Sequence, residues 1–293
     1  MPNFKTYCNI TTPVKDLIVI MSDKTGSPTI ASCVAYNRIV SQRINPNLLI
    51  GIGDFEDDQA TTHHNSETLA ELGSIPKYST PGNHDFDFGD RVEFDAAFNG
   101  GGYQKVSGNN VDFFIYDLYL NVAEDGYFTY ENASARSEAS FKTSAQGQWI
   151  IAQLAASTAA WKVVVFHQPV TDWVSWDGSI NPAGLTVPGM AWDWKGYGAD
   201  ILLTGHEHFN ERLTIDTGSG NMPVLVCGPT GTVQIAPDAQ IATSDYLVSL
   251  DVEFTIGTLN ILEATATDLT IKTLGVNATR IISTIKDTLT LSK

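Results

Sequence analysis

The chain has 293 residues, of which 43% are hydrophobic, and only 24 are glycine and 12 proline, so we expect a packed globular protein rather than a disordered one. This length fits one large α/β domain as readily as two small ones. Seventeen Lys and Arg residues against 33 Asp and Glu residues give a formal net charge of −16, which disfavours general binding of nucleic acid and of anionic membranes.

Short apolar runs alternate with helical patterns in the first half of the chain. Runs of Ile, Val and Leu without polar alternation predict strands that are covered on both faces. Between these runs, apolar residues at helical spacing predict helices. The predicted elements are strands at residues 15–21, 48–50 and 78–80 and helices at residues 31–44 and 61–72, the second of which ends at Gly73.

Strands dominate the second half. Residues 111–120 suit a strand or hairpin, and Thr143 to Gln146 have the capping-box pattern at the start of a helix that carries Trp149, Ile150 and Leu154. Further strands are predicted at residues 161–166, 200–203, 213–215, 224–227, 246–252, 259–262, 269–273 and 281–285. This order predicts an α/β fold in which sheets are sandwiched between helical layers, with residues 1–293 forming one domain.

The chain carries no strong signal for a membrane or an oxidising compartment. Its longest apolar run near the start, residues 17–21, is too short for a membrane span and too late for a signal peptide. The cysteines, Cys8, Cys33 and Cys227, are far apart and odd in number, which favours free thiols. We therefore expect a soluble protein, cytoplasmic by default.

Five loops that follow predicted strands carry side chains able to bind metal. These side chains are Asp23, Asp54, the run Asn83-His84-Asp85, His167, and the pair His206 and His208. Ligands of α/β sheets collect outside the carboxyl ends of the strands, so the loops can converge on one pocket. Each element alone has another interpretation, such as a helix cap for an aspartate or a turn for Gly-Asn-His-Asp. Four of the six histidines fall in these segments, which favours a common site.

The residue types suit a pair of metal ions. Carboxylate, amide oxygen and imidazole favour Mn, Fe or Zn over Ca, which prefers more oxygen ligands, and over Cu(I), which prefers sulfur. A carboxylate can bridge two ions about 3.5–4 Å apart, the separation of two-metal hydrolytic sites. Two bound cations would also make the pocket locally positive in a strongly acidic protein.

The order and spacing of these blocks resemble the signature of the calcineurin-like metallophosphoesterases. The run Gln146-Gly-Gln-Trp-Ile before Val-Val-Val-Phe-His167 is most similar to the purple acid phosphatase branch. The resemblance covers about residues 15–228, and the strands of residues 229–293 can complete the same fold. It implies a four-layer αββα sandwich of two mixed β-sheets flanked by helices.

The resemblance also implies a role for each matched residue. Asp54 would bridge both metals, Asp23 and His208 would bind the first, and Asn83, His167 and His206 would bind the second. His84 would act on the phosphate as general acid or electrostatic stabiliser, with Asp85 orienting it. A metal-bound hydroxide would then attack phosphorus in a mono- or diester.

Two positions depart from the family pattern at the first metal. Thr25 stands where most members have a histidine, and Asp57 stands where the purple branch has a tyrosine. The purple colour should therefore be absent. Asp57 is the best local candidate to replace the missing ligand, ahead of Glu56 and Asp58, unless it only caps the following helix.

Aromatic residues follow the fourth block and suggest a substrate surface. Trp173 and Trp176 could stack on an aryl ester or nucleobase, or they could pack a long loop onto the domain. The sequence thus predicts a metal-dependent phosphoesterase for a small phosphate ester. The alternative is a weakened, binding or structural module of the same fold within a larger assembly.

Overall fold

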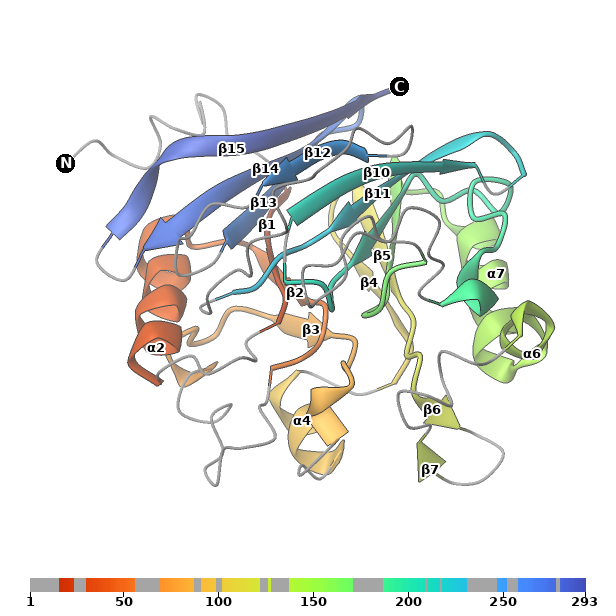
Figure 1. Cartoon of the computed structure of the whole chain (residues 1–293), viewed down its shortest axis with the longest axis horizontal. Helices are drawn as coiled ribbons and strands as arrows, with labels where there is room; N and C mark the ends of the chain where they lie inside the picture. Colours follow the sequence, from red (N-terminus) through yellow and green to blue (C-terminus); the bar gives the residue numbers. More distant parts are fainter. Residues whose placement is uncertain are drawn as a thin grey trace, which may run out of the picture.

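Two large β-sheets face each other in the computed structural model, and helices cover their outer sides (Figure 1). The described residues are 16–23, 30–55, 69–86, 91–98, 102–121, 126–127, 137–170, 187–208, 210–216, 218–230, 247–251, 258–277 and 280–293. Within these ranges, no helix is long and apolar enough to cross a membrane.

The first sheet, sheet A, joins the two ends of the chain. Its strand order is β15-β14-β13-β1-β2-β3. The bounds are β1 Asp16–Met21, β2 Leu48–Gly51, β3 Lys77–Ser79, β13 Thr258–Ala264, β14 Asp268–Asn277 and β15 Arg280–Ser292. Strands β1, β2 and β3 are parallel, whereas β13 pairs antiparallel with β1, so the sheet is mixed.

The second sheet, sheet B, is also mixed. Its order is β12-β10-β11-β9-β8-β5-β4, and β5, β8, β9 and β11 run parallel. The bounds are β4 Gln104–Ser107, β5 Val111–Ile115, β8 Trp161–Val165, β9 Ile201–Thr204, β10 Asn210–Asp216, β11 Asn221–Val226 and β12 Leu247–Asp251. A separate ribbon pairs β6 Leu120–Asn121 with β7 Gly126–Tyr127.

The helices lie on opposite outer sides of the sandwich. Figure 1 shows α2 at one side and α6 and α7 at the other. Their bounds are α2 Ile30–Ile39, which continues as a π-helical turn Val40–Ile44, α4 Arg91–Ala97, α6 Glu138–Thr143 and α7 Ala145–Ala156. Short 3₁₀ turns cover His84–Phe86 and Pro188–Met190.

Alternation along the strands divides the core into three apolar layers. In β1, Ile18 and Ile20 point between the sheets, while Val19 and Met21 pack with Tyr36 of α2 on the outer side. Strands of sheet B alternate in the same way between the central layer and the layer under α6 and α7. Because both faces of each sheet are buried, the strands read as continuous apolar runs. The predicted four-layer αββα fold is confirmed.

Most predicted elements are present, and one helix start is corrected. Residues 61–68 lie outside the described ranges, but Gly73 does end a helical turn, with φ of 58°. Helix α7 begins one residue later than the capping box predicted, because the side chain of Ser144 accepts the bond from Gly147 N. Gln146 is not available as a capping partner, since its amide exchanges two hydrogen bonds with the backbone of Asp117.

A buried carboxylate joins the sheets at the end opposite to the carboxyl ends of β1 and β8. Asp16, at the start of β1, accepts hydrogen bonds from the backbone N–H groups of Asn109 and Asn110, both at 2.7 Å. It also accepts hydrogen bonds from the side-chain amides of these two residues, at 3.1 and 3.0 Å. The β4–β5 turn of sheet B is thereby fixed to sheet A.

We expect Asp16→Ala to lower the free energy of unfolding by about 3 kcal/mol, because four amide donors would lose their buried, charged acceptor. Urea unfolding followed by circular dichroism measures the change. Asp268→Ala is the matched control, since Asp268 is an exposed aspartate that accepts hydrogen bonds from the hydroxyls of Thr267 and Ser292, and its loss should lower the stability much less. Equal losses in both variants would contradict the assignment.

Candidate metal centre

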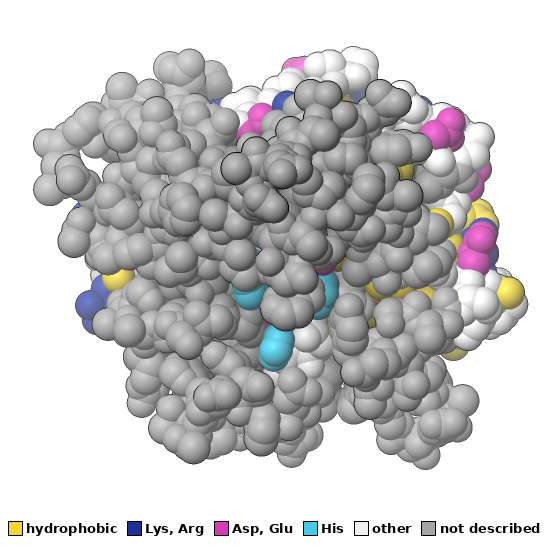
Figure 2. All heavy atoms as spheres, viewed as in Figure 1, with side chains coloured by type: hydrophobic (Ala, Val, Ile, Leu, Met, Phe, Trp, Pro, Cys, Tyr) yellow, Lys and Arg dark blue, Asp and Glu magenta, His cyan; other side chains and the backbone are white. Residues whose placement is uncertain are grey.

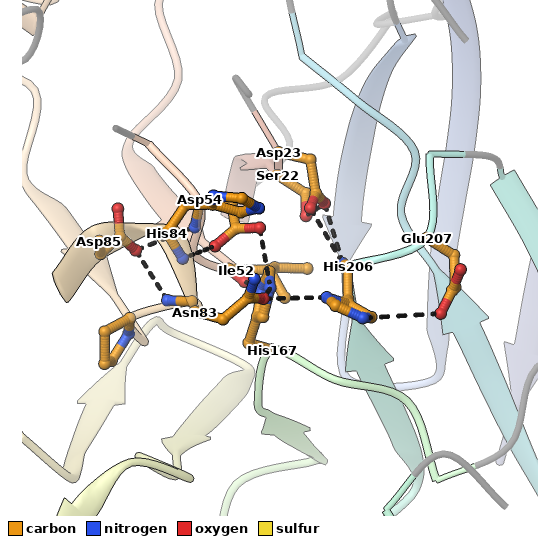
Figure 3. A network of polar contacts seen from close by, with 12 residues as sticks. Ser22, Asp23, Ile52, Asp54, Asn83, His84, Asp85, His167, His206 and Glu207 are labelled. Atoms are coloured by element: carbon orange, nitrogen blue, oxygen red, sulfur yellow. Dashed lines mark hydrogen bonds and ion pairs between the residues drawn. The ribbon is translucent and has the colours of Figure 1, made fainter. Parts of the chain in front are cut away.

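The loops at the carboxyl ends of the parallel strands meet between the two sheets (Figure 3). Sheet A contributes the residues after β1, β2 and β3, and sheet B those after β8 and β9. The predicted site residues among them are Asp23, Asp54, Asn83, His84, Asp85, His167, His206 and His208. Asp57, Trp173 and Trp176, with Thr25, lie outside the described residues.

His167 is oriented by a carbonyl of the opposite sheet. Its Nδ1 lies 2.6 Å from the backbone oxygen of Ile52, so Nδ1 donates the proton and Nε2 faces the pocket. Nε2 lies 3.2 Å from both Asn83 Oδ1 and Asp54 Oδ2. The ring is fully buried, so these contacts are shielded from solvent.

His206 completes a convergent set of ligand atoms. Its Nδ1 lies 3.0 Å from the same Asn83 Oδ1. Ligand atoms of Asp54, His167 and His206, all buried, lie within 4.8 Å of one another. One carboxylate, one amide oxygen and two imidazoles around one point fit a cation such as Mn, Fe or Zn.

Asp85 joins the loops after β2 and β3. Its carboxylate accepts backbone N–H bonds from Asp54 at 2.9 Å, Phe55 at 2.8 Å and Gly82 at 2.7 Å. In return, the backbone N–H of His84 donates to Asp54 Oδ1 at 2.9 Å. Asp85 therefore fixes the backbone around Asp54, a role that the sequence did not predict. Its predicted action on the His84 ring stays a prediction.

Asp23 occupies a different place from the convergent set. Its carboxylate accepts the backbone N–H of His206 at 3.0 and 3.1 Å and the hydroxyl of Ser22. His208, two residues beyond His206 in the sequence, is half-buried. These two candidate ligands of the first metal do not join the cluster that Asp54, His167 and His206 form in the described chain.

Three of these residues have left-handed backbone conformations. The φ angles are 43° for Asp23, 55° for Asp54 and 71° for His206. Such conformations cost about 1–3 kcal/mol in residues other than glycine and persist where the surroundings enforce them. Gly82 permits the close approach, because a Cβ there would lie 2.5 Å from the backbone nitrogen of Asp54.

The pocket shifts the pKa values of neighbouring groups in opposite directions. Burial, with the charge of Asp54, raises the pKa of Asp23 to about 8 and that of Asp85 to about 7. Burial alone would raise the pKa of Asp54, but the charges of the surrounding histidines hold it below its usual range. Burial and the charge of His167 lower the pKa of His206 to about 3. Opposed shifts of this kind are typical of functional sites.

In the metal-free protein, protonated His167 supplies the positive charge that balances the buried aspartates. Burial opposes its protonation, but the charges of Asp54 and Asp23 raise its pKa to about 9. A metal ion at the same point would replace that proton, because imidazole binds metal in its neutral form.

Fold and site together define a metal-binding two-sheet α/β protein, and comparisons give its family. A sequence profile of the calcineurin-like phosphoesterases matches residues 26–210, so the chain belongs to the calcineurin-like phosphoesterase family. The family predicted from the five sequence blocks is confirmed. No curated protein sequence matches the chain.

Solved structures share the fold at low identity. The structure of PhoD matches with a TM-score of 0.63 and 12% sequence identity, and the match covers 95% of this chain and 70% of the PhoD chain. GAP50, described as the anchor in the inner membrane complex of Plasmodium, has a TM-score of 0.57 and 14% identity, covering 94% and 88%. At this identity the likeness concerns the fold alone.

In the metal-free protein, we expect the free energy of unfolding to fall by about 3 kcal/mol as the pH rises from about 7 to about 9. The pKa of His167, about 9, and that of Asp23, about 8, lie above their ordinary values of 6.5 and 3.8. In this window the folded state therefore binds more protons than the unfolded state, and raising the pH removes that stabilisation.

Urea unfolding in the presence of a chelator measures this dependence. Excess Mn²⁺ is the control, because a bound cation replaces the proton and should flatten the curve. A metal-free protein whose stability is constant or rises over the same window would contradict the prediction.

Proposed function

We propose that the chain is a metal-dependent phosphoesterase that hydrolyses phosphate mono- or diesters at a binuclear site. The convergence of Asp54, Asn83, His167 and His206 on one buried point carries this proposal. Two bound cations would supply the positive charge that draws and polarises a phosphate in a protein of net charge −16.

The proposed ligands divide between two positions. Asn83, His167 and His206 would hold the second metal, and Asp54 would bridge it to the first. Asp23 and His208 would hold the first metal, with Asp57 as the added oxygen ligand in place of the histidine or tyrosine of relatives. The ligand types favour Mn, Fe or Zn.

His84 is the proposed catalytic group that does not bind metal. The bond from its backbone N–H to Asp54 Oδ1 fixes its position beside the bridging carboxylate. The residue is half-buried, and Figure 2 shows histidine side chains reaching the surface near the centre of the viewed face. A half-buried imidazole beside the bridging carboxylate can donate a proton or a hydrogen bond to a phosphate oxygen. Trp173 and Trp176 would contact the rest of the ester.

The domain and branch assignments are also proposals. The whole chain, 1–293, would form one domain, and the pairing of β13 with β1 supports this by joining the last strands to the first. The assignment to the purple acid phosphatase-like branch rests on the sequence blocks. This chain has Asp57 at the position where that branch has a tyrosine.

A second candidate function is an anchoring or structural module within a larger assembly. It is favoured by the likeness to GAP50, whose structure is described as an anchor and is covered over 88% of its length. The departures at Thr25 and Asp57 also favour it, because they weaken the first metal position. The buried ligand cluster favours the enzyme.

Hydrolysis of p-nitrophenyl phosphate and of its bis-ester, with and without Mn²⁺, tests the proposal. We expect Mn²⁺-dependent release of p-nitrophenol, and the preferred ester distinguishes monoesterase from diesterase. A protein that binds Mn²⁺ but hydrolyses neither ester would leave the anchoring module as the better candidate.

The metal assignments predict different losses for two variants. Asp54→Ala should lose both bound metals, because Asp54 is the proposed bridge, whereas His167→Ala should lose mainly one. Elemental analysis after dialysis measures the content. Asp112→Ala is the control, since Asp112 is a buried carboxylate that binds Ser157 and Lys105 instead. Two equivalents of metal in Asp54→Ala would disprove the bridge.

The role of His84 predicts a separate effect. His84→Ala should lower kcat by roughly 10²–10⁴-fold, the range for general acid–base groups, with metal content nearly unchanged. Steady-state kinetics and metal analysis of the same preparation measure both. Loss of a metal would make His84 a ligand, and full activity would remove its catalytic role.

A further inference from the structure

Thr230 binds the turn that carries Asp23 through three hydrogen bonds. Its backbone N–H donates to the carbonyl oxygens of Ser22 at 2.7 Å and Asp23 at 3.1 Å. Its hydroxyl oxygen accepts the backbone N–H of Ser22 at 3.0 Å. Thr230 lies just beyond β11 in sheet B and is 1% exposed, so solvent cannot replace these bonds.

Thr230 is itself held from the outer layer of the fold. The side chain of Tyr36, in α2, hydrogen-bonds to that of Thr230, and the Tyr36 hydroxyl donates to the carbonyl of Thr258 at 3.0 Å. The backbone N–H of Thr258 donates to the carbonyl of Pro229 at 2.8 Å. A helix and β13 thus fix the position of Thr230, which makes it a rigid support.

The turn that Thr230 supports is strained and connects the two sheets. Asp23 has a φ of 43°, and its backbone N–H donates to the carbonyl of Gly53, next to Asp54. Its carboxylate holds the backbone N–H of His206, whose ring joins the metal cluster. A left-handed aspartate keeps this conformation only while neighbouring groups enforce it, and Thr230 contributes three hydrogen bonds to this turn.

We propose that Thr230 is a positioning residue that holds the carboxylate of Asp23 against the backbone of His206 and so aligns the first metal position. It acts through Asp23 and contacts neither substrate nor metal. The metal part of this inference rests on the proposed function, whereas the alignment of Asp23 and His206 does not. Precise support matters most here, because Thr25 and Asp57 replace the first metal's usual ligands.

Three variants and one control test the proposal. Thr230→Val keeps the shape but removes the hydroxyl, and Thr230→Ser restores it. Tyr36→Phe removes the phenol hydroxyl, and with it both the contact to Thr230 and the bond to the carbonyl of Thr258, while the hydroxyl of Thr230 stays in place. It provides a milder change if Thr230→Val fails to fold. The control is Thr273→Val, because the buried hydroxyl of Thr273 donates to Asn260 Oδ1 at 2.7 Å in β14, so its loss leaves a comparable buried group unpaired.

Amide hydrogen exchange by NMR is the first measurement, made without metal. We expect the amides of Ser22 and His206 to exchange about tenfold faster in Thr230→Val, since the bonds that protect them loosen. The increase should be smaller in Tyr36→Phe. Exchange should be at the wild-type rate in Thr230→Ser and in Thr273→Val, although Thr273→Val should melt at a similarly lowered temperature.

Mn²⁺ titration by calorimetry is the second measurement. One equivalent should bind about tenfold more weakly in Thr230→Val, with wild-type affinity in Thr230→Ser and Thr273→Val. Wild-type exchange at His206 together with wild-type Mn²⁺ affinity in Thr230→Val would overturn the positioning role. If the wild-type protein binds no Mn²⁺, the proposed function fails, and exchange at His206 alone decides the role of Thr230.

Discussion

The hydrogen bond between His167 Nδ1 and the carbonyl of Ile52 is the contact on which the site depends. It joins the end of β8 in sheet B to the end of β2 in sheet A, and it turns Nε2 toward Asp54 and Asn83. Gly53 makes it possible. With φ of 93°, a Cβ at this position would lie 2.7 Å from His167 Nδ1. The metal pocket is therefore a consequence of how closely the two sheets approach at this end.

The second constraint is electrostatic. Asp23, Asp54 and Asp85 are buried together, and the charge of Asp54 contributes to the raised pKa values of the other two. Without metal, protons on Asp23 and His167 offset this crowding. A cation would take their place and release them, so metal affinity and pH are linked in this protein. Backbone N–H groups also offset the buried negative charge, because they donate hydrogen bonds to the carboxylates of Asp85 and Asp23.

The sequence predicted the fold and the convergence of the polar loops because both follow from local patterns. Apolar runs such as residues 17–21 mark doubly covered strands, and polar residues directly after them mark the carboxyl ends where parallel strands meet. It did not predict which partner each polar group chooses. Gln146 bonds to Asp117 instead of capping α7, and Asp85 bonds to three backbone N–H groups. Thr230 and Tyr36 belong to no motif, since their role depends on contacts about 200 residues apart in the sequence. The predictions for Asp57, Trp173 and Trp176 concern residues outside the described ranges.

The order of strands in sheet A has a consequence for biosynthesis. β1 needs β13 as its antiparallel partner, and Thr230 must reach back to Ser22, yet these segments emerge from the ribosome more than 200 residues after β1. During translation β1 therefore keeps one unpaired edge, which is a site for wrong association. Closing such distant pairs is also intrinsically slow. The nascent chain carries every proposed ligand by residue 208, but the turn of Asp23 gains its support only after Thr230 has also been synthesised.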